Sequence, residues 1–372
     1  MSADLAAAIH AAAPPVPPGR QAALRRFRRF GADGVLGVLT RGAAVIVLLM
    51  LTMLVGVLLM HAIPSMKQFG LAFITSSQWR PNELEQPKRG PDGKIVLEDG
   101  ETVMETLPPV FGALPVIYGT TVSSMIALAF AVPLSLGAAL FIVRVAPRLK
   151  IAAPISFLVE FLASIPSIAY GIWGLFVLAP FMQNTVEPGL LRILGGVPGL
   201  GWMFEQTITL GGQNVVRPVS LTGKDMLTGG LILGIMILPI VTAVSRDVLK
   251  SVPRGQIEGT LALGATWWQS CRAMLVYARS GLFGAVMLGL ARAAGETMAV
   301  TMVIGNNNQI VASPFAPAQT MSSLLANEFA EATGEMHMSA LLYVALILLV
   351  MSLIFNVAAR ALFVGGESKV QE

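Results

Sequence analysis

Long apolar runs separated by short polar segments dominate the chain. A helix that crosses a membrane needs about 20 mostly apolar residues. Pro133, Pro166 and Pro239 interrupt three of the runs but do not exclude helix, because neighbouring helices can satisfy the freed carbonyl groups. The pattern therefore predicts an all-α polytopic membrane protein with six transmembrane helices. The predicted spans are residues 43–60, 116–143, 151–182, 229–245, 281–304 and 339–359.

The spans define the tails and the domain organisation. The first run is longer than the apolar part of a typical signal peptide, so residues 43–63 are predicted to be an uncleaved anchor. Residues 1–42 are the predicted N-terminal tail, and its Ala- and Pro-rich first 19 residues are expected to be disordered. Residues 116–360 form the main transmembrane domain, and residues 361–372 are the predicted C-terminal tail.

Two long connections join the spans on one side. In residues 64–115, the pairs Asp92-Gly93 and Asp99-Gly100 bracket a short β-type run, which predicts a small hairpin. Residues 183–228 are rich in Gly and Pro and are predicted to be a loop.

Composition supports a membrane protein rather than a soluble one. Charged residues make up 12% of the chain, against about 25% in soluble globular proteins. This excludes a disordered chain, a nucleic-acid-binding module and an ordinary cytosolic enzyme. The single cysteine, Cys271, excludes an intramolecular disulfide and a cysteine metal cluster. His10, His61 and His337 form no metal-ligand pattern.

The charge distribution predicts the orientation. If the N-terminus is cytoplasmic, the inside segments carry 16 Lys and Arg and 6 Asp and Glu, and the outside segments carry 8 and 13. Lys and Arg favour cytoplasmic segments. Both termini are therefore predicted to be cytoplasmic, and residues 64–115 and 183–228 extracytoplasmic. The overall net charge of +4 says little about partners.

Known nucleotide and hydrolase motifs are missing from the sequence. Gly223-Lys224 is followed by Asp225 rather than Ser or Thr, so it is not a phosphate-binding loop. No H-E-x-x-H or G-x-S-x-G motif occurs. The chain is therefore not predicted to be an enzyme, and the energy for any pumping comes from a partner or an ion gradient.

The longest predicted cytoplasmic connection, residues 246–280, has an amphipathic pattern. Ile257, Leu261, Ala265 and Trp268 recur at helical spacing. Gly264 within this pattern indicates a helix break or a close backbone approach. Such a helix either lies on the membrane surface or docks in a groove of a partner.

The same connection resembles a known transporter family. Glu258-Gly-Thr-x-x-x-Gly264 has the spacing of the E-A-A-x-x-x-G loop of ABC importer permeases, although Gly259 and Thr260 replace the alanines. The downstream I-x-L-P of that loop is replaced by residues 274–277. The resemblance implies a type I ABC importer permease fold, in which this loop is a coupling helix seated in an ATPase subunit. The residues implied in ATPase coupling are Glu258, Gly264, Ile257, Leu261 and Ala265.

Two further segments make the resemblance more specific. Residues 164–181 and 288–306, with the R-A-x-G-E-T-M-A run, resemble the PstC family of phosphate importer permeases in the bacterial inner membrane. The resemblance covers roughly residues 110–360. It implies membrane lipid around the chain, no cofactor in it, and ATP bound by a PstB-like subunit. It also implies a PstA-like second permease and an extracytoplasmic PstS-like phosphate-binding protein as partners, with no nucleic acid.

Other functions remain open at this point. They are the sister permease PstA, a permease for another oxyanion, an ion-coupled secondary transporter with Glu160 or Glu296 as proton site, and a membrane scaffold. The large EAA-like loop and the lack of an evident inverted repeat argue against the secondary transporter.

Three charged residues lie inside predicted spans. Arg292 and Glu296 are four residues apart and are expected to share a helix face, and Glu160 lies in another span. Ionisable groups at this depth are costly and point to function. One interpretation is an ion pair of Arg292 with Glu296 or Glu160. The other assigns the three residues to the substrate path, with Arg292 binding phosphate and Glu296 restraining Arg292 when no substrate is bound.

The fifth predicted span also carries a stripe of small residues. Gly281, Ala285, Gly289 and Ala293 recur at every fourth position. Small residues at this spacing let helix backbones approach closely in membranes. The stripe predicts tight contact with another helix, in this chain or in a partner, although generic glycine content is the alternative.

Overall fold

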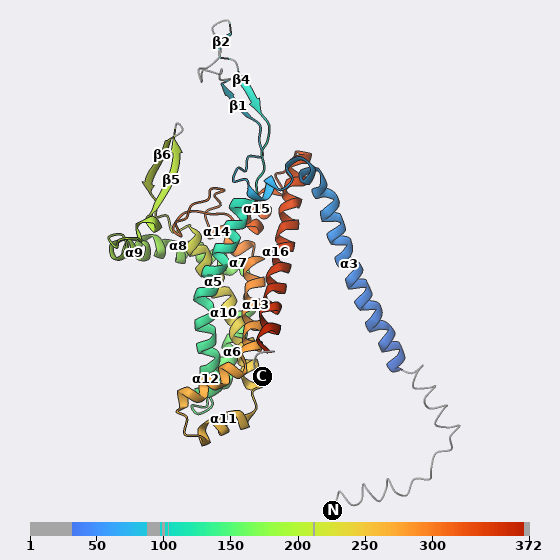
Figure 1. Cartoon of the computed structure of the whole chain (residues 1–372), viewed down its shortest axis with the longest axis vertical. Coiled ribbons are helices and arrows are strands. Elements are labelled where there is room, and N and C mark those ends of the chain that lie inside the picture. Colours follow the sequence, from blue (N-terminus) through green and yellow to red (C-terminus); the bar gives the residue numbers. More distant parts are fainter. Residues whose placement is uncertain (1–31, 88–96, 99–100, 103, 211–212, 368–372) are drawn as a thin grey trace, which may run out of the picture. The chain divides into compact units, whose positions relative to one another are not determined.

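The computed structural model describes residues 32–87, 97–98, 101–102, 104–210 and 213–367 (Figure 1). The predicted disorder of residues 1–19 falls outside the described residues. The chain divides into two units, Met1–Met60 and His61–Glu372. Each unit is described by itself.

The described part of the first unit is one apolar helix. Helix α3 spans Ala32–Phe69 and continues into the second unit, so it is longer than the predicted span 43–63. None of the residues in its most apolar window is buried. Leu48 and Met53, for example, are 65% and 71% exposed. An exposed apolar helix of this length needs a lipid environment.

The described residues contain four helices that are long and apolar enough to cross a membrane. Two bent helix pairs raise the number to six if each pair is one span, as predicted. The straight spans are Gly34–Phe69, Leu114–Val145, Met226–Lys250 and Glu335–Val357, and the bent pairs are Ala152–Ala163 with Ser167–Leu194 (87°) and Trp267–Tyr277 with Arg279–Ala294 (68°). The prediction of an all-α polytopic membrane protein is confirmed.

Breaks in the helices correct two predicted spans. Residues 151–182 are not one helix, because the chain is extended at Pro166 (ψ 139°) between α6 and α7. A proline disfavours helical geometry in the residue before it. Residues 281–304 are also not one helix, because α13 ends at Ala294 and α14 begins at Met298.

The remaining elements follow in chain order. A π-helical segment, η1, follows α5, and short helical segments that include the π-type η2 and η3 continue the bent region after α7. The helices of the second unit are α4 (Ala72–Thr75), α5 (Leu114–Leu140), η1 (Phe141–Val145), α6 (Ala152–Ala163), α7 (Ser167–Trp173), η2 (Gly174–Leu178), α8 (Ala179–Phe181), η3 (Met182–Val186), α9 (Glu187–Leu194), η4 (Gly201–Phe204), α10 (Met226–Lys250), α11 (Arg254–Ala262), α12 (Trp267–Tyr277), α13 (Arg279–Ala294), α14 (Met298–Val303), α15 (Met321–Glu328) and α16 (Glu335–Glu367).

Three antiparallel strand pairs occupy the two long connections. The predicted hairpin in residues 64–115 is confirmed by two of these pairs, β1 (Leu84–Pro87) with β4 (Met104–Leu107) and β2 (Leu97–Glu98) with β3 (Glu101–Thr102). The loop prediction for residues 183–228 is wrong in part. This connection contains α9 and a hairpin of β5 (Glu205–Leu210) and β6 (Gln213–Pro218), whose Thr, Ile and Val residues favour strands.

The C-terminal tail prediction also changes. Helix α16 continues to Glu367, so the predicted tail 361–372 begins as helix. Residues 368–372 lie outside the described residues.

Helix α10 lies at the centre of the second unit. It packs against α5, α6, α13 and α14, and 61% of its most apolar window is buried. Glycines allow this packing. A Cβ added to Gly230 would lie 2.5 Å from Ile126 Cγ2 of α5, and one added to Gly234 would lie 2.9 Å from Phe130 Cδ1.

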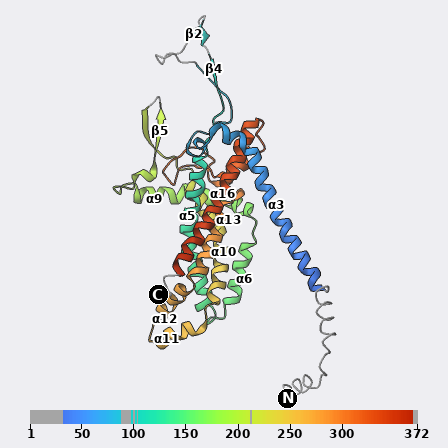
Figure 2. The ribbon, with the colours of Figure 1, turned by 45° about the vertical axis from the view of Figure 1, so that its right-hand side comes forward.

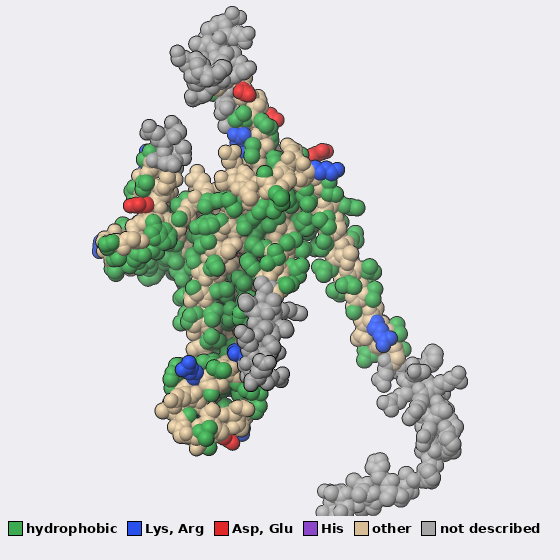
Figure 3. Space-filling model, viewed as in Figure 1, with side chains coloured by type: hydrophobic (Ala, Val, Ile, Leu, Met, Phe, Trp, Pro, Cys, Tyr) green, Lys and Arg blue, Asp and Glu red, His purple; other side chains and the backbone are tan. Residues whose placement is uncertain are grey.

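The two ends of the second unit differ in composition. Figures 1 and 2 show the strand pairs at one end and α11 with α12 at the other. In Figure 3, hydrophobic side chains cover the helical middle, and coloured charges gather at the α11–α12 end and on the hairpins. This distribution fits a bundle whose middle is in lipid and whose ends are in water.

The stripe of small residues on α13 packs against α10 of the same chain. Ala285 and Ala293 are buried. A Cβ added to Gly289 would lie 2.6 Å from Val241 Cγ2, and one added to Gly281 would lie 2.5 Å from Val248 Cγ1. The predicted close helix contact is therefore confirmed within the chain.

Gly289→Ala tests this packing, with Gly284→Ala as the matched control on the same helix. An alanine at position 289 must displace Val241, so we expect it to destabilise the protein by about 1–3 kcal/mol. Gly284 has open space around it, so the same change there should be neutral or stabilising. Thermal unfolding in detergent measures both, and equal melting temperatures for the two variants would contradict the packing.

Candidate functional site

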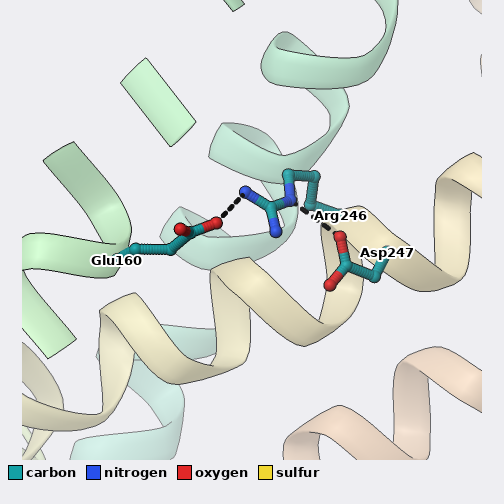
Figure 4. A network of polar contacts seen from close by, with 3 residues as sticks. All are labelled: Glu160, Arg246 and Asp247. Atoms are coloured by element: carbon teal, nitrogen blue, oxygen red, sulfur yellow. Dashed lines mark hydrogen bonds and ion pairs between the residues drawn. The ribbon is translucent and has the colours of Figure 1, made fainter. Parts of the chain in front are cut away.

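Arg246 joins two helices through an ion network near the end of α10. Its Nη1 lies 2.9 Å from Oε1 of Glu160 on α6, and its Nε lies 2.9 Å from Oδ1 of Asp247 (Figure 4). The Arg246 side chain is 9% exposed, whereas the Glu160 side chain is 59% exposed. A buried guanidinium needs such partners, because an unpaired buried charge is costly.

The expected partner of Glu160 was wrong. Glu160 pairs with Arg246 rather than with Arg292, because α6 packs against α10. Sequence reasoning placed Arg246 in the cytoplasmic connection. The signal that it stays helical was available, since no helix-breaking residue occurs between Pro239 and Pro253.

Arg292 and Glu296 do not share a helix face. Gly295 caps the end of α13, and Glu296 lies in the break before α14. Oε1 of Glu296 accepts from the backbone N–H of Ala299 (3.3 Å), and its backbone carbonyl accepts from Oγ of Ser322 (2.7 Å). Glu296 therefore stabilises the break and the first turn of α14.

Arg292 is exposed on α13 in the described structure. None of the ion pairs among the described residues includes it, so the expected pair with Glu296 is absent there. A guanidinium without a carboxylate partner can bind an anion through charge-assisted hydrogen bonds.

A pocket opens beside the break that holds Glu296. Its volume is about 450 Å³, and it is lined by Gly295, Thr297 and Ser322 together with apolar residues of the α15 region and of α16. The break thus borders open space rather than a closed helix–helix contact.

The α11–α12 connection is a helical hairpin with a sharp turn. Helix α11 ends at Ala262, and Gly264 adopts φ +80° with nothing within 4 Å of an added Cβ. Thr266 then caps α12 in a capping box with Gln269. Of the two predicted explanations for Gly264, the helix break is therefore correct and the close backbone approach is not.

The turn divides the predicted apolar face. Ile257 packs against the buried cluster around Leu249 and Met274, whereas Leu261 is 44% exposed. Ala265 lies in the turn, after α11 has ended. The single face predicted for residues 257–268 is wrong, because positive φ at Gly264 reverses the chain direction.

The turn nevertheless presents an exposed surface. Leu263 is 90% exposed and Trp268 is 64% exposed, and Glu258 is exposed beside them on α11. Exposed apolar residues clustered at a polar end are typical of a protein–protein contact.

Glu187 and Asp225 form a buried acidic pair, which was not predicted from the sequence. Both residues are 0% exposed. Oδ1 of Asp225 accepts from Thr228 N (2.7 Å) as the N-cap of α10, but its Oδ2 and both Glu187 oxygens have no partner among the described residues. The capping pattern of Asp225 before an apolar run could have been found in the sequence.

We expect the two carboxyls to share one proton. Burial raises the pKa of Asp225, which directly precedes α10, and Glu187 lies beside Asp225. The ion pairs among the described residues lie elsewhere. Two buried carboxylates side by side cannot both be charged, so one proton is held between them.

Comparison with known proteins decides the family. A sequence model of the family described as "Binding-protein-dependent transport system inner membrane component" matches residues 131–363, which is more than half of the chain. The chain belongs to this family. The match covers α10, the α11–α12 turn, Arg292 and the break at Glu296. Members of this family are inner membrane components, as the exposed apolar spans require.

Individual relatives match most of the length of the chain. It is 39% identical to the phosphate transport system permease protein PstC of Mesorhizobium japonicum, over 95% of the chain and 96% of that protein. It is 38% identical to PstC of Haemophilus influenzae, over 85% and 88%. A solved structure of the MetNI methionine ABC transporter in inward-facing conformations covers 68% of the chain and 92% of its own, with 17% identity and a TM-score of 0.44.

Glu187→Gln tests the shared proton. A raised carboxyl pKa in the folded state gives stability that is complete below the ordinary carboxyl range and is lost as pH rises through the raised pKa. The glutamine amide donates to Asp225 without a shared proton. We therefore expect the melting temperature of the variant to fall less than that of the wild type between the ordinary carboxyl range and mildly alkaline pH, with a gain of about 1–3 kcal/mol at the upper end of that range.

Glu205→Gln on the exposed face of β5 is the control, because it removes the same charge without changing the pair. It should keep the pH dependence of the wild type. Parallel melting curves for Glu187→Gln and the wild type would refute the shared proton.

Proposed function

We propose that the chain is the PstC-type permease subunit of an ATP-driven phosphate importer and forms half of the translocation pathway. The observation that carries the proposal is the near full-length similarity to permeases named for phosphate transport. The proposed substrate and partners are inferred from the names of these relatives. The geometry supports the same function, because the chain has an exposed turn between α11 and α12 and an exposed arginine on α13, Arg292, that has no ion-pair partner among the described residues.

The partners proposed are those of such an importer. They are a second, PstA-like permease, a PstB-like ATPase that binds ATP, and an extracytoplasmic PstS-like phosphate-binding protein. The family description, which names a binding-protein-dependent system, supports the last of these. Lipid surrounds the spans, and the chain itself needs no cofactor.

The orientation proposed places the α11–α12 end and both termini in the cytoplasm. The excess of Lys and Arg in the segments at this end supports it. The hairpins at the opposite end then face the binding protein.

ATP-driven closure of the ATPase pair is proposed to act through the α11–α12 turn. Ile257 anchors α11 to the bundle through the cluster that includes Leu249 of α10. The other residues proposed for ATPase coupling follow Ile257 in the chain, toward or within the turn. They are Glu258, Leu261, Gly264 and Ala265. Glu160 and Arg246 tie α6 to α10 four residues before α10 ends. A pull on the turn is thus passed to two helices rather than one.

Phosphate is proposed to pass Arg292 on its way through the bundle. The guanidinium offers the anion a bidentate contact, and no carboxylate pairs with it among the described residues. Glu296 acts by holding the break open beside the pocket, not by restraining Arg292.

Arg292→Gln tests the substrate path, with Arg148→Gln, an exposed residue between η1 and α6, as control. Loss of a charge-assisted contact of about 1.5–3 kcal/mol should lower phosphate uptake by roughly ten- to a hundredfold. Membrane insertion and copurification of the ATPase should not change. Normal uptake by Arg292→Gln would exclude this role.

Leu263→Asp tests the coupling surface, with Val216→Asp on β6 as a control at the opposite end of the unit. Both side chains are exposed, at 90% and 58%. If Leu263 contacts the ATPase as a central apolar residue, the substitution should weaken association by about tenfold or more. Copurification of the ATPase measures this, and equal recovery with both variants would overturn the assignment.

A further inference from the structure

A polar pocket lies outside the proposed path, where two distant segments meet. Its volume is about 420 Å³, and it is lined by residues 77–80 and 307–309. The first segment leads from α4 to β1, and the second follows α14. Every lining side chain carries a hydrogen-bond donor, and none is acidic. The indole N–H of Trp79 is already donated to Oε2 of Glu328 (2.8 Å), so the other side chains supply the available donors.

Arg80 supplies the one cationic side chain of the lining. Its backbone is fixed by two hydrogen bonds with Val110 (2.7 and 3.0 Å) at the base of the β1–β4 hairpin. Its Nη2 donates to the carbonyl of Pro108 (3.0 Å). Its Nε is buried and has no partner in the described part of the chain, and none of the ion pairs found there includes Arg80.

This arrangement leaves most of the guanidinium donors available. A guanidinium has five N–H groups, and a buried donor without an acceptor is costly. A half-buried arginine that is held by the backbone and not neutralised by a carboxylate is therefore suited to an anion.

The amides of the second segment complete the lining. Oδ1 of Asn307 accepts from Gln309 N (3.1 Å), which leaves its Nδ2 group as a donor. Oδ1 of Asn308 is buried without a partner in the described structure. The pocket thus offers several donors and one unused acceptor. A phosphate that still carries a proton matches this set, because its P–O oxygens accept and its P–OH donates, whereas sulfate has no proton to donate at neutral pH.

We propose that this pocket is a low-affinity binding site for protonated inorganic phosphate, held by Arg80 and Asn308 ahead of Arg292. The inference rests on the proposed function. The two places are close in the chain, because the break at Glu296 follows Arg292, α14 (Met298–Val303) follows the break, and the lining residues 307–309 come shortly after α14. With a single cation and neutral donors, we expect a dissociation constant of about a millimolar, which lets the anion leave again.

Lipid headgroups carry the same phosphate chemistry, so the experiment separates the two sources. The assembled transporter in a maltoside detergent is treated with phenylglyoxal, which modifies guanidinium groups, and modification is followed residue by residue by mass spectrometry. Inorganic phosphate, sulfate and phosphatidic acid are added in separate arms. Arg217, exposed on β6, is the internal control.

Inorganic phosphate should slow the modification of Arg80 by about fivefold at four times its dissociation constant. It should leave Arg217 unchanged, and sulfate should protect less. An Arg80 that is not modified at all, or is not protected by phosphate, overturns the site. Equal protection by sulfate, or protection by phosphatidic acid alone, also overturns it.

Uptake provides a second measurement. Arg80→Gln should slow phosphate uptake by about three- to tenfold relative to Arg217→Gln, while copurification of the ATPase stays the same. If the wild type takes up phosphate and the two variants are equal, this inference fails and the proposed function stands. If the wild type takes up none, the proposed function fails instead.

Discussion

The close approach of α5 and α13 to α10 is the constraint on which the rest of the structure depends. Gly230 and Gly234 of α10 let α5 approach, and Gly281 and Gly289 of α13 let α13 approach. In lipid no hydrophobic effect drives helices together, so dispersion contacts between closely packed backbones must hold the bundle. Because α10 is buried at the centre of the bundle, it positions the helices that pack against it.

The chemistry of the molecule is arranged along that helix. At its start, Asp225 caps α10 and lies beside the buried Glu187. Near its end, Arg246 links it to Glu160 of α6, and the α11–α12 turn follows. Arg292 lies on the neighbouring α13, between these two ends. The proposed motion at the turn and the proposed binding of an anion by Arg292 are thus connected through α10.

The sequence was sufficient for the class of fold and insufficient for the geometry of the charges. Apolar runs predicted a polytopic membrane protein because lipid requires length and hydrophobicity, both of which are readable locally. The small-residue stripe on α13 was readable for the same reason. The partner of Glu160 was not readable, because it depends on which helices pack together. The four-residue spacing of Arg292 and Glu296 wrongly predicted a shared helix face, because Gly295 ends the helix between them. The Glu187–Asp225 pair joins residues 38 positions apart through tertiary contact.

We propose that this permease imports phosphate with energy from a partner ATPase rather than from an ion gradient. The most direct measurement is uptake of radiolabelled phosphate by the transporter reconstituted in liposomes, with ATP supplied to the ATPase side and with or without a proton ionophore. We expect uptake that requires ATP and is unchanged by the ionophore. Uptake that proceeds without ATP and stops when the proton gradient is removed would contradict it.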